Sequence, residues 1–366
     1  MSSTVTSIQE TEGFALPAGD APEPVVEPTL AELVEENEAS EIRTLDDVRN
    51  LFRAMGTCCR TMVQGRDDVI ALVLTALFAD GHVLLEDHPG SGKTTLAKAL
   101  GNTIIRNQPN DLFAAFRRIQ FTPDLLPSDV TGVTMFDTET NSFTFRNGPI
   151  FANVVLADEI NRTSPKVQAA LLEAMAEKQV TVDNQTHRLE GVFFVLATQN
   201  PLDLAGTYPL PRAQLDRFLF KIKMAHLARE GELAVLSKWK AARAKPCEFG
   251  VSPSDLLVAR RVVEESVRVT PAIHECLVDI AEATRKDKRI ALGVSTRSLV
   301  VAISALQVWA MVHGRDFVSP KDIKALSIPL FSHRLELAPG AHDADQILAE
   351  CVAPVVERIT RKTMAA

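Results

Sequence analysis

The feature that most constrains the fold is the stretch VLLEDHPGSGKTTLAKAL, Val83 to Leu100, which sets a glycine-rich loop between apolar segments. The pattern predicts a strand over His82–Glu86 before the loop and a helix over Thr94–Leu100 after it. Gly90 and Gly92 let backbone N–H groups approach an anion, and the positive end of the helix adds to the attraction. Because a phosphate-binding loop requires this strand–loop–helix order, we interpret the stretch as a nucleotide site.

Asp87 stands where the usual pattern G-x-x-x-x-G-K-[ST] has its first glycine. Aspartate tolerates unusual backbone angles better than most residues, and Asp87 falls at the predicted strand end, before the anion-binding backbone. We therefore expect an intact loop, in which Lys93 reaches the β- and γ-phosphates and the Thr94 hydroxyl binds Mg²⁺. The candidate nucleotide-binding residues of the loop are Pro89, Gly90, Ser91, Gly92, Lys93, Thr94 and Thr95.

Further strands and helices alternate along the chain, which indicates an α/β sheet. Two apolar runs, Asn153–Asp158 and Val192–Asn200, are of the kind buried on both faces of a parallel sheet. A helix is predicted over Ser164–Lys178, with Pro165 as its first residue. The remaining predicted strands are Arg117–Phe121 and Arg217–Met224.

Two predicted hairpins interrupt this alternation. One has alternating arms about the polar tip Asp137–Asn141, and the other turns at Asp183–Asn184. The core of a parallel sheet does not need such hairpins, so we regard them as candidates for contact with partners or neighbouring subunits.

From about Leu227 the pattern becomes helical, with three helix starts marked by Ser252-Pro253, Thr270-Pro271 and Ser319-Pro320. Gly314 is expected just after a helix over Thr296–His313. The sequence therefore predicts three parts: an N-terminal tail (1–42), an α/β nucleotide-binding domain (43–226) and a helical domain (227–366).

The tail carries more than the whole net charge of −8, because ten of the 47 acidic residues and none of the 39 Lys and Arg lie in residues 1–42. Such a segment buries too little apolar surface to offset its ordering entropy, so we expect it to be disordered. The rest of the chain is close to neutral, which argues against nucleic acid as the main partner.

The sequence also gives expectations for the cellular compartment and for membrane association. The start MSSTVTSIQE has neither a basic nor an apolar region of a secretion signal, and the apolar run Val69–Ala79 is too short to span a bilayer. The five cysteines form no C-x-x-C pair, so reduced thiols are expected. We predict a cytoplasmic protein without membrane insertion.

Two more elements carry candidate chemistry. Asp158 and Glu159 end one apolar strand; the first could hold Mg²⁺, and the second could polarise an attacking water. Acids commonly end strands, so this pair gains weight from the phosphate loop that precedes it. Asn200 ends another apolar strand, where its amide could orient the same water.

The motifs HPGSGKT, VVLADEINR, ALLEAM, VFFVLATQNP and AQLDRFLF, in this order, resemble those of MoxR-type AAA+ ATPases from about Arg43 to Leu337. The resemblance implies an α/β P-loop NTPase, an AAA+ core with a parallel sheet and inserted β-hairpins, followed by a small all-α lid domain. It also implies that an acid is accepted in place of the loop's first glycine.

The resemblance assigns roles to individual positions. Lys93 and Thr94 match the Walker A residues, Asp158 and Glu159 the Walker B pair, and Asn200 sensor 1. It further implies an arginine finger for the neighbouring subunit's ATP at Arg217, a sensor 2 arginine at Arg297, and contacts to adenine from Val63 to Arg66 and from Ile70. The hairpin near Val133–Phe145 matches the helix-2 insert, and Gln179–Leu189 the hairpin before sensor 1.

One position departs from the family pattern. Arg212 stands where relatives usually have an acid. We interpret it as a surface change, the alternative being a second basic contact to the neighbour's nucleotide.

The resemblance implies Mg²⁺-dependent ATP hydrolysis in a homo-oligomeric ring, with six subunits expected, that remodels or matures partner protein complexes. Partners with a von Willebrand factor A domain often accompany such proteins. Two alternatives stay open: a nucleotide-switched binding protein with slow hydrolysis, and a nucleic-acid motor. The intact Asp158-Glu159 pair argues against the first, and the scarcity of basic residues in both hairpins argues against the second.

Overall fold

The structure is a computed structural model that describes residues 41–87, 91–105, 113–139, 141–189, 191–200, 206–227, 229–238 and 249–365. Nearly all of the predicted acidic tail, together with the loop residues Pro89 and Gly90, lies outside these ranges.

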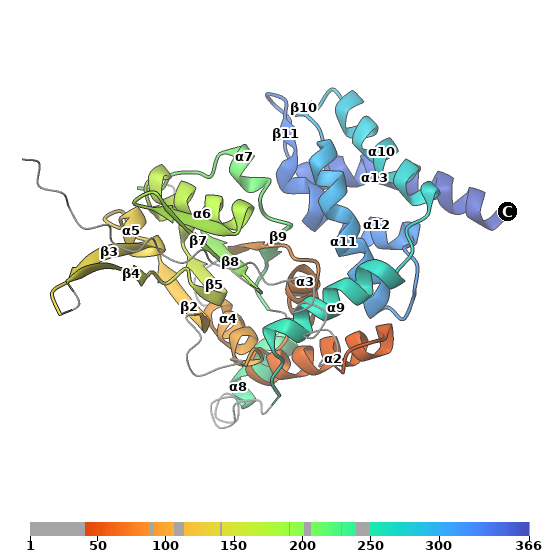
Figure 1. Ribbon diagram of the computed structural model, residues 1–366. Coiled ribbons are helices and arrows are strands. Elements are labelled where there is room, and N and C mark those ends of the chain that lie inside the picture. Colours follow the sequence, from red (N-terminus) through yellow and green to blue (C-terminus); the bar gives the residue numbers. More distant parts are fainter. Residues whose placement is uncertain are drawn as a thin grey trace, which may run out of the picture. The chain divides into compact units, whose positions relative to one another are not determined.

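The centre of the fold is a five-stranded sheet in which all neighbouring strands run parallel (Figure 1). The predicted parallel α/β sheet is therefore confirmed. Its strands, in spatial order, are β2 (Ala114–Gln120), β5 (Ala152–Asp158), β8 (Phe194–Gln199), β1 (Val83–Asp87) and β9 (Phe220–Met224).

Strand ends differ from the predictions at two places. Strand β2 begins at Ala114, well before Arg117, because Ala114 already pairs with Ala152 of β5. Strand β9 begins only at Phe220, because the N–H groups of Arg217 and Phe218 close turns onto the preceding helix α7 (Arg212–Leu215).

The two faces of the sheet are covered by different helices, as the alternation of side chains along β1 shows. Val83 and Leu85 pack in the hydrophobic cluster that includes α2 (Leu45–Met62), α3 (Asp67–Phe78) and α4 (Lys93–Asn102). Leu84 points to the opposite face and packs in the cluster that includes α6 (Pro165–Glu177).

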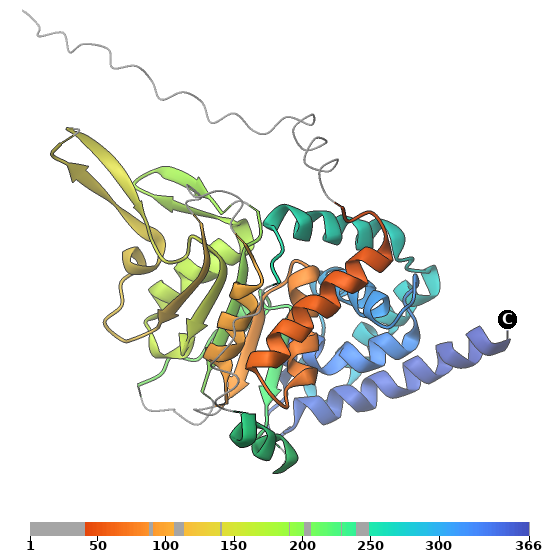
Figure 2. The same cartoon turned by 90° about the horizontal axis from the view of Figure 1, so that it is seen from below.

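Both predicted hairpins are present. The first is β3 (Gly132–Asp137) with β4 (Ser142–Asn147), which follows the short helix α5 (Pro127–Thr131); the second is β6 (Gln179–Val182) with β7 (Gln185–Arg188). Asp183 and Asn184 both have positive φ, as a two-residue hairpin turn requires. The rings of Phe145 and His187 stack with their centroids 3.8 Å apart, so the two hairpins contact each other. Figure 2 shows both hairpins, in yellow and light green, on the same side of the sheet.

The chain after β9 is mainly helical. The predicted starts are confirmed, since Pro253, Pro271 and Pro320 are each the first residue of a helix, and Gly314 follows α11 with a φ of 79°. The elements are α8 (Arg229–Lys238), α9 (Pro253–Ser266), α10 (Pro271–Lys286), β10 (Ile290–Leu292), α11 (Thr296–Val312), α12 (Pro320–Phe331), the 3₁₀ turn η3 (Ser332–Arg334), β11 (Glu336–Leu337) and α13 (Ala344–Ala365). The antiparallel ribbon β10–β11 is an addition that the sequence did not indicate.

A single hydrophobic cluster joins the sheet to these later helices. Besides Leu85 of β1 and Val73 of α3, it contains Ala259 of α9, Leu306 of α11 and Val355 of α13. Residues from Ser40 to Ala366 form one compact unit. The domain boundary between residues 226 and 227 thus remains a prediction from sequence, and the apolar core runs across it.

None of the described helices is long and apolar enough to cross a membrane. Cys59, Cys276 and Cys351 are buried free thiols, and burial raises the pKa of the Cys59 thiol to about 12. The expectation of thiols throughout is wrong at Cys58, which takes part in a disulfide bond.

Candidate functional site

The predicted loop and acid residues gather at one edge of the sheet. Strand β8 lies between β1 and β5, and all three run parallel, so their carboxyl ends meet there. Asp87 is the last residue of β1, as predicted, and Asp158 is the last residue of β5. In open parallel sheets, ligands bind at this edge.

The loop after β1 ends in a backbone geometry suited to an anion. Gly92 caps helix α4 in the left-handed region, with a φ of 96°, and a Cβ placed there would meet no atom within 4 Å beyond its own chain neighbours and helix backbone. The Ser91 hydroxyl is buried and has no hydrogen-bond partner in the part of the chain that the structure describes. Lys93, Thr94 and Thr95 form the first turn of α4. An unsatisfied buried hydroxyl beside a helix N-terminus fits a bound phosphate.

A cavity of about 260 Å³ adjoins this loop. It brings Val63 together with Ser91, Gly92 and Thr95, four of the residues expected to bind the nucleotide. Ile70 does not line this cavity; it lies in the core face of α3 with 1% of its surface exposed. The other walls come from the α2–α3 junction, the end of β9 and helix α8, through Met62, Gln64, Arg66, Met224, Ala225, His226, Leu227, Glu232 and Val235.

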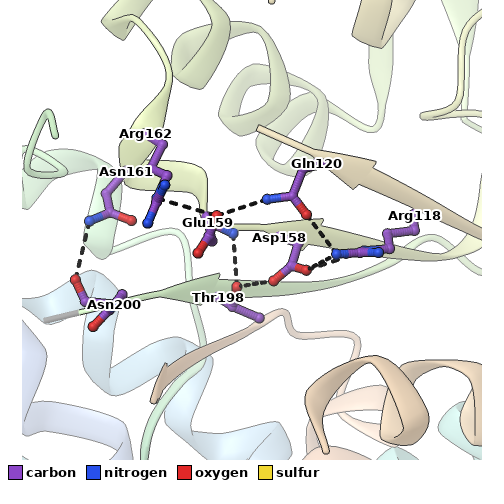
Figure 3. Close-up of polar contacts among 8 residues, drawn as sticks. All are labelled: Arg118, Gln120, Asp158, Glu159, Asn161, Arg162, Thr198 and Asn200. Carbon is purple, nitrogen blue, oxygen red and sulfur yellow. Dashed lines mark hydrogen bonds and ion pairs between the residues drawn. The ribbon is translucent and has the colours of Figure 1, made fainter. Parts of the chain in front are cut away.

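The Asp158 carboxylate is buried and has donors on both oxygens (Figure 3). Its Oδ1 accepts a hydrogen bond of 2.7 Å from the Thr198 hydroxyl. Its Oδ2 accepts two from the Arg118 guanidinium, at 2.7 Å from Nη2 and 3.2 Å from Nε. A charge held in this way is compensated without any ligand.

Glu159 is fixed by its backbone and by its side chain. The residue has a φ of 58°, and its N–H donates to the Thr198 hydroxyl at 2.8 Å. Its Oε2 accepts from the Gln120 amide at 2.8 Å and lies 3.3 Å from Arg162 Nε (Figure 3). Backbone strain of this kind occurs at functional sites, because the surrounding contacts hold it in place.

Asn200 follows β8 and lies beside Asn161 (Figure 3). The Asn161 amide donates to the backbone oxygen of Asn200 at 3.4 Å, and its own Oδ1 is buried without a partner. The predicted residues Asp158, Glu159 and Asn200 therefore occupy neighbouring strand ends.

Arg217 and Arg297 belong to other elements, the turn before β9 and helix α11. Arg217 lines a depression of about 510 Å³ with Glu173 and Glu177 of α6, and this depression shares no residue with the cavity next to Gly92. Arg297 is exposed in the first turn of α11. Among the described residues, neither arginine forms a salt bridge within the chain, so both guanidinium groups are available to a ligand.

Asp216, next to Arg217 in the chain, links this segment to the helical part. Its carboxylate accepts a hydrogen bond from the Ser298 hydroxyl at 3.2 Å and pairs with Arg334 Nη1 at 3.0 Å. The Arg334 side chain is only 2% exposed, and burial lowers its pKa to about 10 although Asp216 opposes the shift.

Arg212 has partners within its own chain, which neither interpretation of the sequence anticipated. Its guanidinium donates to the backbone oxygens of Leu292 and Arg334 and pairs with Glu336 at 3.1 Å. The side chain therefore joins α7 to the β10–β11 ribbon within the same chain.

The oxygen ligands at the sheet edge fit a hard cation such as Mg²⁺. Thr94 and Asp158 supply a hydroxyl and a carboxylate, the ligand types that Mg²⁺ prefers. Across the described residues, no group of three or more His, Cys, Asp and Glu could hold a metal by itself. A cation here would take further ligands from water and phosphate, which is the usual pattern for Mg²⁺.

Sequence reasoning missed Thr198, Arg118 and Gln120. Thr198 was visible as the polar residue inside the apolar run VLAT, since a buried hydroxyl needs a partner. Arg118 and Gln120 are two residues apart and so share one face of β2, but only the pairing of β2 with β5 brings them to the acids.

The chain is similar to known proteins over most of its length. The family model for the ATPase family associated with various cellular activities (AAA) matches residues 82–220, and the AAA lid domain matches residues 282–351. The protein YeaC of Bacillus subtilis is 46% identical over 86% of this chain and 97% of its own length. Chaperone MoxR1 of Mycobacterium tuberculosis is 35% identical over 93% of this chain and 87% of its own length. A crystal structure from Cytophaga hutchinsonii superposes with a TM-score of 0.72 at 34% identity, covering 91% of this chain and 98% of that one.

Proposed function

Because the chain belongs to the MoxR family of AAA ATPases, we propose that it hydrolyses ATP with Mg²⁺ at the subunit interfaces of a homo-oligomeric ring and thereby remodels partner proteins. Nucleotide binding and ATP hydrolysis follow from the family. The observation that carries the proposal of a shared site is that Arg217 lines a depression that has no residue in common with the cavity next to Gly92.

Within one subunit, each residue has a distinct task. Lys93 binds the β- and γ-phosphates, while Ser91, Gly92 and Thr95 hold the phosphate chain at the N-terminus of α4. The cavity beside Val63 receives the adenosine. Thr94 and Asp158 hold Mg²⁺, which neutralises charge on the phosphates when bound.

Glu159 and Asn200 act on the attacking water. The Glu159 carboxylate accepts a proton from the water, and the Asn200 amide orients it. Glu159 follows β5 and Asn200 follows β8, and β8 separates β5 from β1, so both residues stand at the sheet edge from which the Lys93 loop leaves. Arg297, at the start of α11, would reach the same phosphates as the sensor of the lid.

Arg217 completes the neighbouring subunit's site. Its position on a separate depression and its lack of an ion pair among the described residues support a role outside its own nucleotide cavity. An arginine supplied by a neighbour is commonly worth about 10³–10⁵ in rate. A ring, for which we propose six subunits, would then be active, and a monomer would be a poor ATPase.

A protein client fits the β3–β4 hairpin better than a nucleic acid does. Four of its exposed side chains are large and apolar, namely Val133, Met135, Phe136 and Phe143, and Phe143 has 74% of its surface accessible. Arg146, near the base of β4, is the exposed basic residue of the hairpin. Residues 133–145 contain no Lys or Arg. We therefore propose that this hairpin contacts a polypeptide client; a von Willebrand factor A domain partner and a cytoplasmic location remain predictions from sequence.

Mixing two inactive variants tests the shared site. Glu159→Gln subunits bind ATP but do not hydrolyse it, and Arg217→Ala subunits have an intact site of their own. A mixed ring contains sites with both a normal Glu159 and a normal Arg217 from the neighbour, so turnover should reappear. Arg212→Ala serves as the matched arginine control, since Arg212 is bound within its own chain. If the mixture stays as inactive as either variant alone, catalysis by a neighbour's arginine is refuted.

The client role needs its own test. The Glu159→Gln ring should retain polypeptide clients, and adding Phe143→Ser should release them while leaving ATP binding unchanged. Equal retention of clients by both variants would exclude the hairpin from client binding.

The alternative of a nucleotide-switched binding protein with slow hydrolysis has a separate test. If the turnover of the wild-type protein is the same before and after it assembles, this alternative is favoured.

A further inference from the structure

Arg118 is bound to the carboxylate of Asp158, which we propose as a metal ligand. Two of its nitrogens bond to Asp158 Oδ2, and the Asp158 side chain is only 9% exposed. Leaving such a carboxylate without a cation would be costly, because it is removed from water and, among the described residues, its other hydrogen-bond partner is the Thr198 hydroxyl. In the structure, Arg118 supplies the positive charge that a bound cation would otherwise supply.

The two partners of Asp158 differ in how readily they can leave. Thr198 is fully buried in the central strand β8 and also accepts the Glu159 N–H, so its movement would disturb the sheet. Arg118 lies on the edge strand β2, and 45% of its side chain is exposed. Its guanidinium can therefore turn into water at small cost. Arg118 is the displaceable partner.

The same guanidinium also sets the orientation of Gln120. Arg118 Nη2 donates to Gln120 Oε1 at 2.6 Å, which leaves the amide nitrogen of Gln120 facing Glu159 Oε2 at 2.8 Å (Figure 3). An amide has one accepting and one donating end, so the arginine fixes which end meets the glutamate. Displacement of Arg118 would therefore also loosen the hold on Glu159.

We propose that Arg118 is a positioning residue that neutralises Asp158 in the metal-free site, is displaced when the metal binds, and thereby weakens the metal affinity. The inference rests on the proposed metal role of Asp158. It adds a competition between one arginine and the cation, and it links the release of Asp158 to the release of Glu159 through Gln120.

Binding of Mn²⁺ to the full chain saturated with ADP tests this competition without any turnover. Free Mn²⁺ is measured by electron paramagnetic resonance during a titration. Arg118→Ala should bind Mn²⁺ about ten-fold more tightly than the wild type, since one charge-assisted contact no longer has to be broken. Arg118→Lys keeps the charge with fewer hydrogen bonds and should lie between the two.

Arg117→Ala is the matched control. Arg117 is the neighbouring residue on β2 and is exposed, and because side chains alternate along a strand it leaves the opposite face from Arg118, so its removal should leave Mn²⁺ affinity unchanged. Asp158→Asn tests the premise separately and should weaken Mn²⁺ binding. If Asp158→Asn weakens binding while Arg118→Ala leaves it equal or weaker, the competition is refuted and the metal site stands. If Asp158→Asn has no effect, the metal assignment itself is overturned.

Thermal unfolding gives an independent measure that a purely structural role of Arg118 would not reproduce. Without ligands, Arg118→Ala should melt below the wild type, because Asp158 has lost its cation. With saturating Mn²⁺ and ADP, the difference should shrink by at least half, since the metal then supplies the charge. An undiminished difference would mean that Arg118 stays on Asp158 in the loaded site, which contradicts the inference.

Discussion

Two buried histidines should make this protein sensitive to mild acid. His333, in η3, donates from Nε2 to the Phe218 carbonyl at 3.1 Å, and its Nδ1 is buried without a partner. Burial, helped by the nearby Arg334 charge, lowers the pKa of His333 to about 3. His82 accepts the Val195 N–H at Nδ1 and donates to the Met175 carbonyl, and burial lowers its pKa to about 4.

The sign follows from comparison with the unfolded chain, where a histidine has a pKa of about 6.5. Between that value and the folded one, the unfolded chain binds more protons, so the free energy of unfolding falls as the pH falls. Each pH unit below 6.5 costs about 1.4 kcal/mol per histidine, which gives about 2 kcal/mol each at pH 5. Both histidines have a pKa below 5 in the folded protein, so the loss of unfolding free energy down to pH 5 depends little on how far below 5 those pKa values lie.

The perturbation is His333→Gln. The glutamine amide can replace the single donor at Nε2 and cannot become protonated, so the variant should lose about 2 kcal/mol between pH 7 and 5, where the wild type loses about 4. Urea unfolding, followed by circular dichroism without nucleotide at several pH values in this range, measures the slope. His274→Gln, an exposed position on α10, is the control and should keep the wild-type slope. A wild-type slope in His333→Gln would refute the reasoning.

Three further outcomes are expected. Lys93→Ala should weaken ATP binding by about 100-fold, because a charge-assisted contact to phosphate is lost; titration with a fluorescent ATP analogue measures it, and unchanged affinity would contradict the loop assignment. Thr198→Val should lower the free energy of unfolding by about 2 kcal/mol, measured by urea unfolding, because it leaves Asp158 Oδ1 and the Glu159 N–H without their shared partner. Thr198→Ser keeps the hydroxyl and should retain most of the wild-type stability. Arg212→Ala should lower stability by about 1–2 kcal/mol and leave turnover per assembled ring unchanged, since its contacts are within one chain; lost turnover at wild-type stability would instead favour the contact to a neighbour's nucleotide.

The parts of the fold that could be predicted are those specified by local pattern. The apolar run before Asp158 indicates a strand buried on both faces, and Pro165, Pro253 and Pro320 mark helix starts through their missing N–H groups. The neighbourhood of Asp158 and Glu159 could be predicted as a site because strand ends meet at one edge of a parallel sheet.

The contacts that hold the site together could not be predicted in the same way. Arg118 reaches Asp158 only because β2 pairs with β5 in a register that sets Gln120 opposite Asp158, and nothing local to either strand specifies that register. Ile70 faces the core because α3 is apolar on all sides, so periodicity gave no guide to which face would meet the cavity. Arg212 illustrates the same limit, since its partners lie far along the chain.

The apolar cluster that runs from Leu85 of the sheet to Leu306 and Val355 bears on how the protein unfolds. Residues 82–220 and 282–351 match two separate family models, but they share one hydrophobic core. We therefore expect the two segments to unfold together. Calorimetry should therefore find a single cooperative transition, with equal calorimetric and van't Hoff enthalpies. A chain cut near residue 226 would expose the apolar surface of α3 and β9 that packs against α11 and α12, and it should therefore aggregate.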